Sequence, residues 1–162
     1  LAINLGTAFL ASSVVGQFQG TIDQLVALAV LMPIVAGMGG NAGTQVLALM
    51  VRGLALGQVG ASNIKPLLWK EARVALLNGI VLGTILALIV LLWFHSIGLS
   101  VVIFIALTCN LVLAAIAGVL VPVTLKRAGY DPALASGIFL TTVTDVMGFF
   151  TFLGLATLVL LR

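Results

Sequence analysis

Long stretches without a charged side chain constrain the fold of this chain more than any other feature. Leu1–Ile22, Gln24–Val51 and Val74–Leu125 contain no Lys, Arg, Asp or Glu. Of the 162 residues, 62% are hydrophobic and 7% are charged, whereas soluble domains have about 45–50% apolar and about 25% charged residues. Because about 20 apolar residues in a helix cross a bilayer core, the sequence predicts an all-α integral membrane protein.

The uncharged runs divide into five expected transmembrane helices. In order, they cover residues 1–22, 24–51, 74–94, 98–122 and 132–161. The first ends near Gln17, and Pro33 should kink the second because proline removes one helical hydrogen bond. Phe94–Gly98 is the expected turn between the third and fourth helices, and Pro122 should mark the end of the fourth. The single cysteine, Cys109, lies in an apolar run and gives no disulfide framework.

Two connections carry nearly all of the basic residues, and this asymmetry predicts the orientation. Except for Arg162, every Lys and Arg lies in Arg52–Arg73, the expected long loop, or in Lys126–Pro132. Cytoplasmic loops carry an excess of Lys and Arg. We therefore expect these connections and the N-terminal end in the cytoplasm and the C-terminus outside, across a cell membrane that in bacteria is the inner one. The basic residues do not indicate nucleic-acid binding, because two loops account for them.

Asp145 lies in the middle of the last expected helix, near the bilayer midplane. A charge there costs roughly 2.5–3.5 kcal/mol on insertion scales, so an intramembrane acid indicates a function by default. Thr141 lies one turn before it on the same helical face, and Gly148 leaves room one turn after it. The alternative is a structural aspartate that is hydrogen-bonded to a neighbouring helix.

The segment Gly37–Gln45 is the most unusual part of the sequence, because it combines four glycines with three polar side chains. Spacings of three and four place the polar residues on one face; they are Asn41, Thr44 and Gln45. One interpretation is an exposed polar face with open backbone carbonyls, which a membrane tolerates only beside protein or water. The other is close helix packing through Gly39 and Gly43. The sequence leaves both open. It is not a dinucleotide fingerprint, since no strand precedes it.

These residue types could hold a hydrated divalent cation if two copies of the chain come together. One carboxylate per chain is a weak site, but two copies around a two-fold axis would present two Asp145 side chains. Mg²⁺ takes oxygen ligands and keeps several waters, so Thr141 could add its carbonyl or hydroxyl group and Asn41 its amide. Asp131 either attracts cations at the cytoplasmic mouth or begins a helix as an N-cap, and both interpretations stay open.

The same segments resemble the membrane domain of the MgtE magnesium channels. The resemblance rests on Gly37–Gln45 with Arg52-Gly53, on Asp131–Ser136 and on Thr141–Asp145, and it covers essentially residues 1–162. It implies a homodimeric channel for Mg²⁺, with Mn²⁺, Co²⁺ and Ca²⁺ as further candidate ions. It also implies five helices per subunit, a pore at the subunit interface, and cytoplasmic magnesium-sensing domains that are missing from this chain.

The resemblance implies a role for three of the candidate residues. Asp145 matches the selectivity-site aspartate, Thr141 a residue that gives its backbone carbonyl there, and Asp131 an acid near the gate. Gly137 falls where some relatives carry Asn, so a polar contact to water could be missing.

Other functions remain to be weighed against a channel. One alternative is a proton- or sodium-coupled carrier in which Asp145 titrates, and another is a structural subunit without a pore. An enzyme is not expected, because a membrane aspartyl protease needs a second intramembrane acid, and His95, which a serine protease would need deep in the bilayer, lies at a turn.

Overall fold

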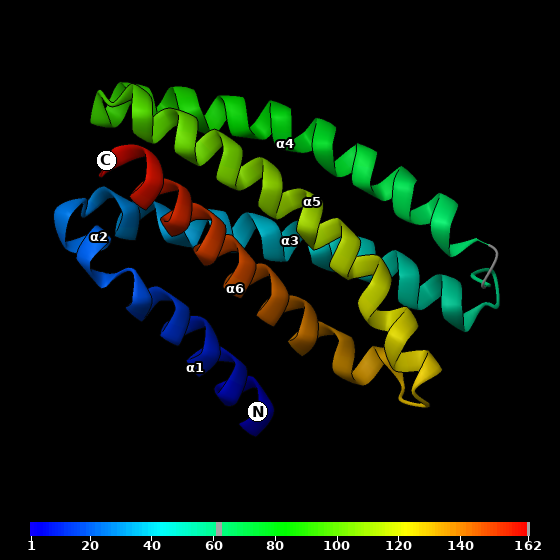
Figure 1. The fold of residues 1–162 in the computed structure, drawn as a ribbon. Coiled ribbons are helices and arrows are strands. Elements are labelled where there is room, and N and C mark those ends of the chain that lie inside the picture. Colours follow the sequence, from blue (N-terminus) through cyan, green and yellow to red (C-terminus); the bar gives the residue numbers. More distant parts are fainter. Residues whose placement is uncertain (61–62, 162) are drawn as a thin grey trace.

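The structure is a computed structural model that describes residues 1–60 and 63–161, and this part of the chain is helical apart from short connections (Figure 1). The helices are α1 (Ala2–Gln17), α2 (Gln19–Gln24), α3 (Ala27–Ala55), α4 (Ile64–Phe94), α5 (Ile97–Arg127) and α6 (Pro132–Leu160). Helices α3 to α6 are each long and apolar enough to cross a membrane. The all-α membrane class is therefore confirmed.

The end expected for the first span near Gln17 is confirmed. Helix α1 begins at Ala2, next to the start of the given sequence, and ends at Gln17. The chain bends at Phe18, and α2 then packs on α6, where the hydroxyl groups of Thr21 and Thr157 are 2.8 Å apart. Helices α3 to α6 thus correspond to four of the five expected spans, and the first expected span corresponds to α1, followed by the short helix α2.

Helix α5 is the centre of the bundle. It packs against α3, α4 and α6, whereas α1 packs mainly on α6, and Figure 1 shows the N-terminal half of α1 diverging from the other helices. The main buried cluster joins Leu31 and Val35 of α3, Ile103 of α5 and Phe152 of α6, each at most 1% exposed. The packing of α3 and α6 on α5 fixes the positions of both helices that carry candidate site residues.

Glycines allow α4 to approach α5 closely. A Cβ atom on Gly79 would lie 2.9 Å from the Cα of Thr108, and one on Gly83 would lie 3.1 Å from the ring of Phe104. Such distances are shorter than ordinary van der Waals contact, so only glycine fits without a shift of its neighbours. Gly79 and Gly83 therefore serve as a packing pair between α4 and α5.

The expected long loop at Arg52–Arg73 is wrong. Helix α3 continues to Ala55 and α4 begins at Ile64, so the connection is much shorter; residues 61–62 lie outside the described part. Good helix formers follow Ile64, and Pro66 stands in the first turn, where its missing N–H is not needed. The second part of the expected loop is therefore the first part of α4.

Helix α5 also continues past its expected end. It runs through Pro122 to Arg127, and α3 likewise runs through Pro33. Proline inside a membrane helix is tolerated because neighbouring groups satisfy the freed carbonyl. The turn expected at Phe94–Gly98 is confirmed: His95 ends α4 with a left-handed φ of 52°, and the Ser96 hydroxyl accepts a hydrogen bond from Leu99 N–H at 3.3 Å.

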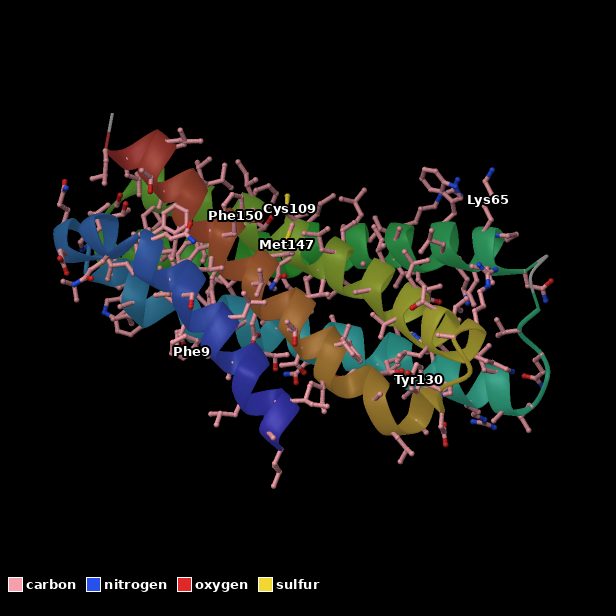
Figure 2. All side chains as sticks on the ribbon, turned by 60° about the horizontal axis from the view of Figure 1, so that its bottom comes forward. Phe9, Lys65, Cys109, Tyr130, Met147 and Phe150 are labelled. Carbon is pink, nitrogen blue, oxygen red and sulfur yellow. The ribbon has the colours of Figure 1, made fainter. Side chains whose placement is uncertain are left out.

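Both basic connections lie at one end of the bundle. The links α3–α4 and α5–α6 are at the right of Figure 1, and Figure 2 shows Lys65 and Tyr130 toward this same end. The Nζ atom of Lys126 donates a hydrogen bond to the carbonyl of Leu54 at 3.0 Å, which satisfies a carbonyl at the C-terminal end of α3. We call this the basic end.

Candidate functional site

The glycine-rich segment is a regular part of α3, and its carbonyls are not opened by unwinding. Gly39 and Gly43 are buried and face the bundle. A Cβ on Gly43 would lie 2.9 Å from a methyl group of Leu140 on α6, and one on Gly39 would collide with the amide of Asn110 on α5. The packing interpretation is therefore confirmed for these two glycines.

The polar residues of the same segment face the other way. Asn41, Thr44 and Gln45 are exposed on the side of α3 that points away from the core. The hydroxyl group of Thr44 donates to the carbonyl of Gly40 at 2.7 Å, so it bonds within its own helix. The two interpretations of the segment are compatible, because they concern opposite faces of one helix.

Asp145 lies near the midpoint of α6 and is partly exposed. Among residues 1–60 and 63–161, its carboxylate accepts no hydrogen bond. The Thr141 hydroxyl donates to the carbonyl of Gly137 at 2.9 Å, and the carbonyl of Thr141 accepts the Thr144 hydroxyl at 3.0 Å. The structural alternative requires a hydrogen-bond donor for the Asp145 carboxylate, and the described part of this chain provides none.

Asp131 is the N-cap of α6. Its Oδ1 atom accepts a hydrogen bond from the backbone N–H of Ala133 at 2.9 Å, and Pro132 occupies the first helical position. Side-chain acceptors at this position satisfy an N–H group that has no partner within the helix. The capping interpretation is confirmed, and the exposed carboxylate remains free to act on ions at the basic end.

The four candidate residues are distributed over two helices that pack together. Asn41 lies near the midpoint of α3, as Asp145 does in α6, and Thr141 is one turn from Asp145. No hydrogen bond within the described residues joins them, and the described residues include no group of three or more His, Cys, Asp or Glu side chains that could hold a metal. Within the described part of one chain, these four residues therefore do not form a complete ion site.

The sequence offers Asn78 and Asn110 as weak candidates to line a cavity, but the structure gives Asn110 a packing role instead. It is fully buried near the midpoint of α5, and its Nδ2 atom donates to the carbonyl of Val35 on α3 at 2.9 Å. Gly39 on one side and Gly148 on the other leave room for this amide; a Cβ on Gly148 would lie 2.8 Å from Nδ2. Asn110 thus joins α5 to α3 by a hydrogen bond and packs against Gly148 of α6, near the midpoints of these helices.

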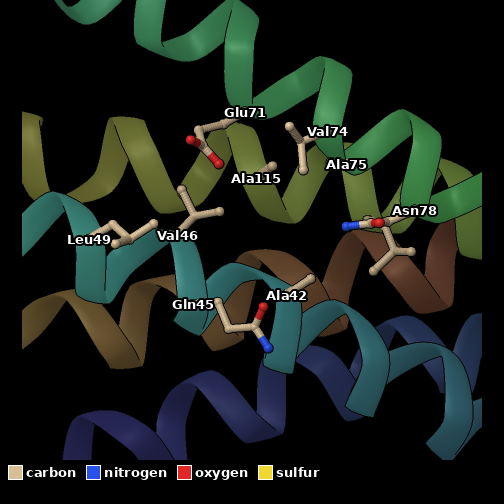
Figure 3. A pocket seen from close by; sticks show the side chains of 10 residues that line it. Ala42, Gln45, Val46, Leu49, Glu71, Val74, Ala75, Asn78 and Ala115 are labelled. Atoms are coloured by element: carbon tan, nitrogen blue, oxygen red, sulfur yellow. The ribbon is translucent and has the colours of Figure 1, made fainter.

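Glu71 falls within the expected loop Arg52–Arg73, but the structure places it on a helix. It lies on α4, its side chain is only 12% exposed, and Lys70 Nζ is 3.8 Å from Oε1. Together with Gln45 and Asn78 it lines a cavity of about 220 Å³ between α3, α4 and α5 (Figure 3). The run of helix formers after Pro66 was the signal that could have placed it.

The exposed faces of the helices differ in chemistry. Along its length, α4 exposes large apolar side chains that suit lipid; they include Leu77, Val81, Ile85, Leu88 and Leu92. Helices α3 and α6 expose polar groups near mid-depth, among them Asn41 and Thr141. These features define an α-helical membrane protein with several spanning helices and an unpartnered carboxylate near the middle of one of them.

Comparison with known proteins identifies the family. Residues 32–155 match the family model of MgtE, described as a divalent cation transporter. The chain therefore belongs to the MgtE family, as the motifs around Gly37–Gln45 and Asp145 suggested. The family is one of transporters, which agrees with the expectation that the chain is not an enzyme.

Three relatives resemble nearly the whole chain. The magnesium transporter MgtE of Bacillus subtilis is 32% identical over 157 residues, 97% of this chain and 35% of that protein. The proteins of the same name from Enterococcus faecalis and Thermus thermophilus are 34% and 33% identical over 91% and 99% of this chain. The chain spans about a third of the length of these relatives.

Proposed function

We propose that this chain is a transmembrane domain that conducts Mg²⁺ across a cell membrane, through a pore between two copies of the chain. A hydrated ion is held between the Asp145 carboxylates of the two copies. Family membership and relatives named magnesium transporters support the choice of ion. Nothing in the comparisons supports Mn²⁺, Co²⁺ or Ca²⁺ as additional transported ions, so the proposal is limited to Mg²⁺.

One observation carries the paired arrangement. Asp145 has no hydrogen-bond partner in the described part of its own chain, and polar side chains of α3 and α6 at the same depth are exposed. Polar groups at membrane depth are stable only beside water or protein. A second copy of the chain, with a water-filled path between the two copies, provides these polar groups with both protein and water. It also brings the two Asp145 carboxylates to one ion.

The neighbouring residues suit a hydrated ion. Mg²⁺ holds several of its waters, and these waters donate hydrogen bonds to acceptors. The Thr141 hydroxyl uses its proton on the carbonyl of Gly137, which leaves its oxygen lone pairs available for such waters. The amide oxygen of Asn41 is a further acceptor from α3, and Asp131 adds a negative charge at the basic end.

Regulation and assembly follow from the same proposal. The relatives are about three times as long as the chain, and we expect cytoplasmic magnesium-sensing domains in the remainder. Neither the family match nor the geometry favours a proton- or sodium-coupled carrier or a non-conducting subunit. Gating by intracellular Mg²⁺ would require the sensing domains as well as this one.

The test is Mg²⁺ uptake into liposomes that contain wild-type protein or Asp145→Asn at equal amounts. The amide keeps the shape of the side chain and removes its charge. Loss of about 1.4 kcal/mol of attraction lowers affinity about tenfold, so uptake at low Mg²⁺ should fall about tenfold or more, with Asp145→Glu intermediate.

Asp23→Asn is the matched control, because Asp23 is an exposed acid at the opposite end of the bundle. It should conduct like wild type, and the purified wild-type protein should have the mass of a dimer by native mass spectrometry. Equal uptake by wild type and Asp145→Asn, or a monomer that still conducts, would refute the proposed site.

A further inference from the structure

A second acidic site lies between α3, α4 and α5, on a different part of the bundle from Asp145. Among the described residues, α4 packs against α5 and touches α3, but it makes no contact with α6. The site is formed where the start of α4 passes the middle of α3. Its acidic residue, Glu71, therefore belongs to a separate environment from that of the Asp145 carboxylate.

The cavity at Glu71 has both polar lining and room for water. Its volume is about 220 Å³, and it is lined by the carboxylate of Glu71 and the amides of Gln45 and Asn78, with apolar residues such as Leu111 between them. Figure 3 shows Glu71 and Asn78 extending from α4, with Gln45 on α3 below them. At about 30 Å³ per water, the cavity holds several water molecules.

The Glu71 carboxylate has no close positive partner in the described structure. Its one ion pair, with Lys70, is long at 3.8 Å, and the Lys70 side chain is 72% exposed. Exposed ion pairs contribute little to stability, whereas a carboxylate removed from bulk water needs compensation. A hydrated cation in the cavity would compensate the negative charge of the Glu71 carboxylate.

The level of the site in the membrane follows from the tryptophans of α4. Trp69 and Trp93 are both exposed, and they are separated by about 36 Å along the helix at about 1.5 Å per residue. Tryptophans favour the two membrane interfaces, so this spacing brackets a core of about 30 Å. Glu71 follows Trp69 by two residues and lies just inside the interface at the basic end.

We propose that Glu71, Gln45 and Asn78 form a second binding site, for a hydrated divalent cation. A hydrated Mg²⁺ keeps several waters, and these waters can bridge the ion to the Glu71 carboxylate and to the amide groups of Gln45 and Asn78 across the cavity. The position just inside the interface lets an ion enter from the solution at the basic end. The site does not include Asp145, so the proposal of a second site can be tested independently of the proposed pore.

The experiment uses Mn²⁺ as a probe, because the electron paramagnetic resonance signal of free Mn²⁺ falls as the ion binds. Purified protein in detergent is titrated as wild type, Asp145→Asn, Glu71→Gln and the double variant. In the Asp145→Asn background, adding Glu71→Gln should weaken the remaining binding about tenfold or more, and Mg²⁺ should compete for that site in the single variant. Undiminished Mn²⁺ binding by the double variant would overturn the proposal.

Two further variants separate a cation site from a simple ion pair. Lys70→Gln removes the competing positive charge, so it should tighten Mn²⁺ binding in the Asp145→Asn background. If Glu71 served only to pair with Lys70, this variant would leave Mn²⁺ affinity unchanged, which counts against the site. Asn78→Leu keeps the acid and removes one amide oxygen, and it should weaken Mn²⁺ binding even if Glu71→Gln folds poorly. Displacement by Na⁺ as effective as by Mg²⁺ would also contradict the divalent assignment.

Discussion

At the scale of single residues, the contact of Asn110 with Gly39 determines how closely α3 approaches α5. A methyl group on Gly39 would collide with the Asn110 amide, whereas nothing lies within 4 Å of a Cβ on Gly40. Overpacking a core costs about 1–3 kcal/mol, and alanine in a helix gains at most about 1 kcal/mol over glycine. Gly39→Ala should therefore lower the free energy of unfolding, and Gly40→Ala should leave it equal or raised.

Thermal unfolding of the two variants in detergent, side by side, checks this prediction. In the Asn110→Ala background the collision is gone, so Gly39→Ala should lose most of its penalty. Equal melting temperatures for Gly39→Ala and Gly40→Ala in the wild-type background would show that Asn110 does not fill the space beside Gly39.

The same residues show which parts of the site could be predicted from the sequence. The mid-membrane position of Asp145 and the outward face of Asn41 follow from the length of an uncharged run and from helical periodicity, and both are local properties. Asn110 and Glu71 depend on which helices become neighbours. The sequence pattern does not show which helices pack together, so the contacts of the buried Asn110 amide and of the Glu71 carboxylate become visible only in the folded bundle.

At the scale of elements, the start of α6 combines a cap with a charge. Asp131 accepts a hydrogen bond from Ala133 N–H, and loss of an N-cap side chain costs about 0.5–2 kcal/mol. Asp131→Ser keeps a capping oxygen and removes the charge, while Asp131→Ala removes both. We expect Asp131→Ser to unfold like wild type and Asp131→Ala to be less stable by about 1 kcal/mol.

Mg²⁺ uptake separates the two roles of Asp131. If its charge attracts cations at the basic end, Asp131→Ser and Asp131→Ala should both reduce uptake at low Mg²⁺, although only Asp131→Ala is destabilised. Wild-type uptake by Asp131→Ser would restrict the residue to capping.

Helix ends were the weakest part of the sequence prediction, for a physical reason. The length of an apolar run predicts the part of a helix that lies inside the bilayer, but not where the helix ends. Helix α4 begins before its uncharged run, and α5 continues past Pro122 to Arg127. Lys, Glu and Arg are good helix formers, so a helix continues into the interface where charge is tolerated. The end of α1 at Gln17, in contrast, agrees with the expected end of the first span.

At the scale of the whole molecule, the bundle has two chemically different ends. The basic end combines the α3–α4 and α5–α6 connections, and the opposite end carries Asp23 and the turn at His95. The fold thus brings together basic residues from two distant stretches of sequence. This combined positive charge favours the cytoplasmic side for the basic end, because loops that carry many Lys and Arg residues tend to remain in the cytoplasm.

This arrangement predicts that Lys65 faces the cytoplasm and Asp23 the outside. Cys109 is exposed, so labelling needs a Cys109→Ala background, into which Lys65→Cys or Asp23→Cys is introduced singly. Both positions are exposed in the structure, so a difference in labelling reports the side of the membrane and not burial. A membrane-impermeant maleimide added to intact cells should label Asp23→Cys and miss Lys65→Cys until the membrane is permeabilised. The reverse pattern would invert the proposed orientation and place the Glu71 cavity on the external side, since it lies at the same end as Lys65.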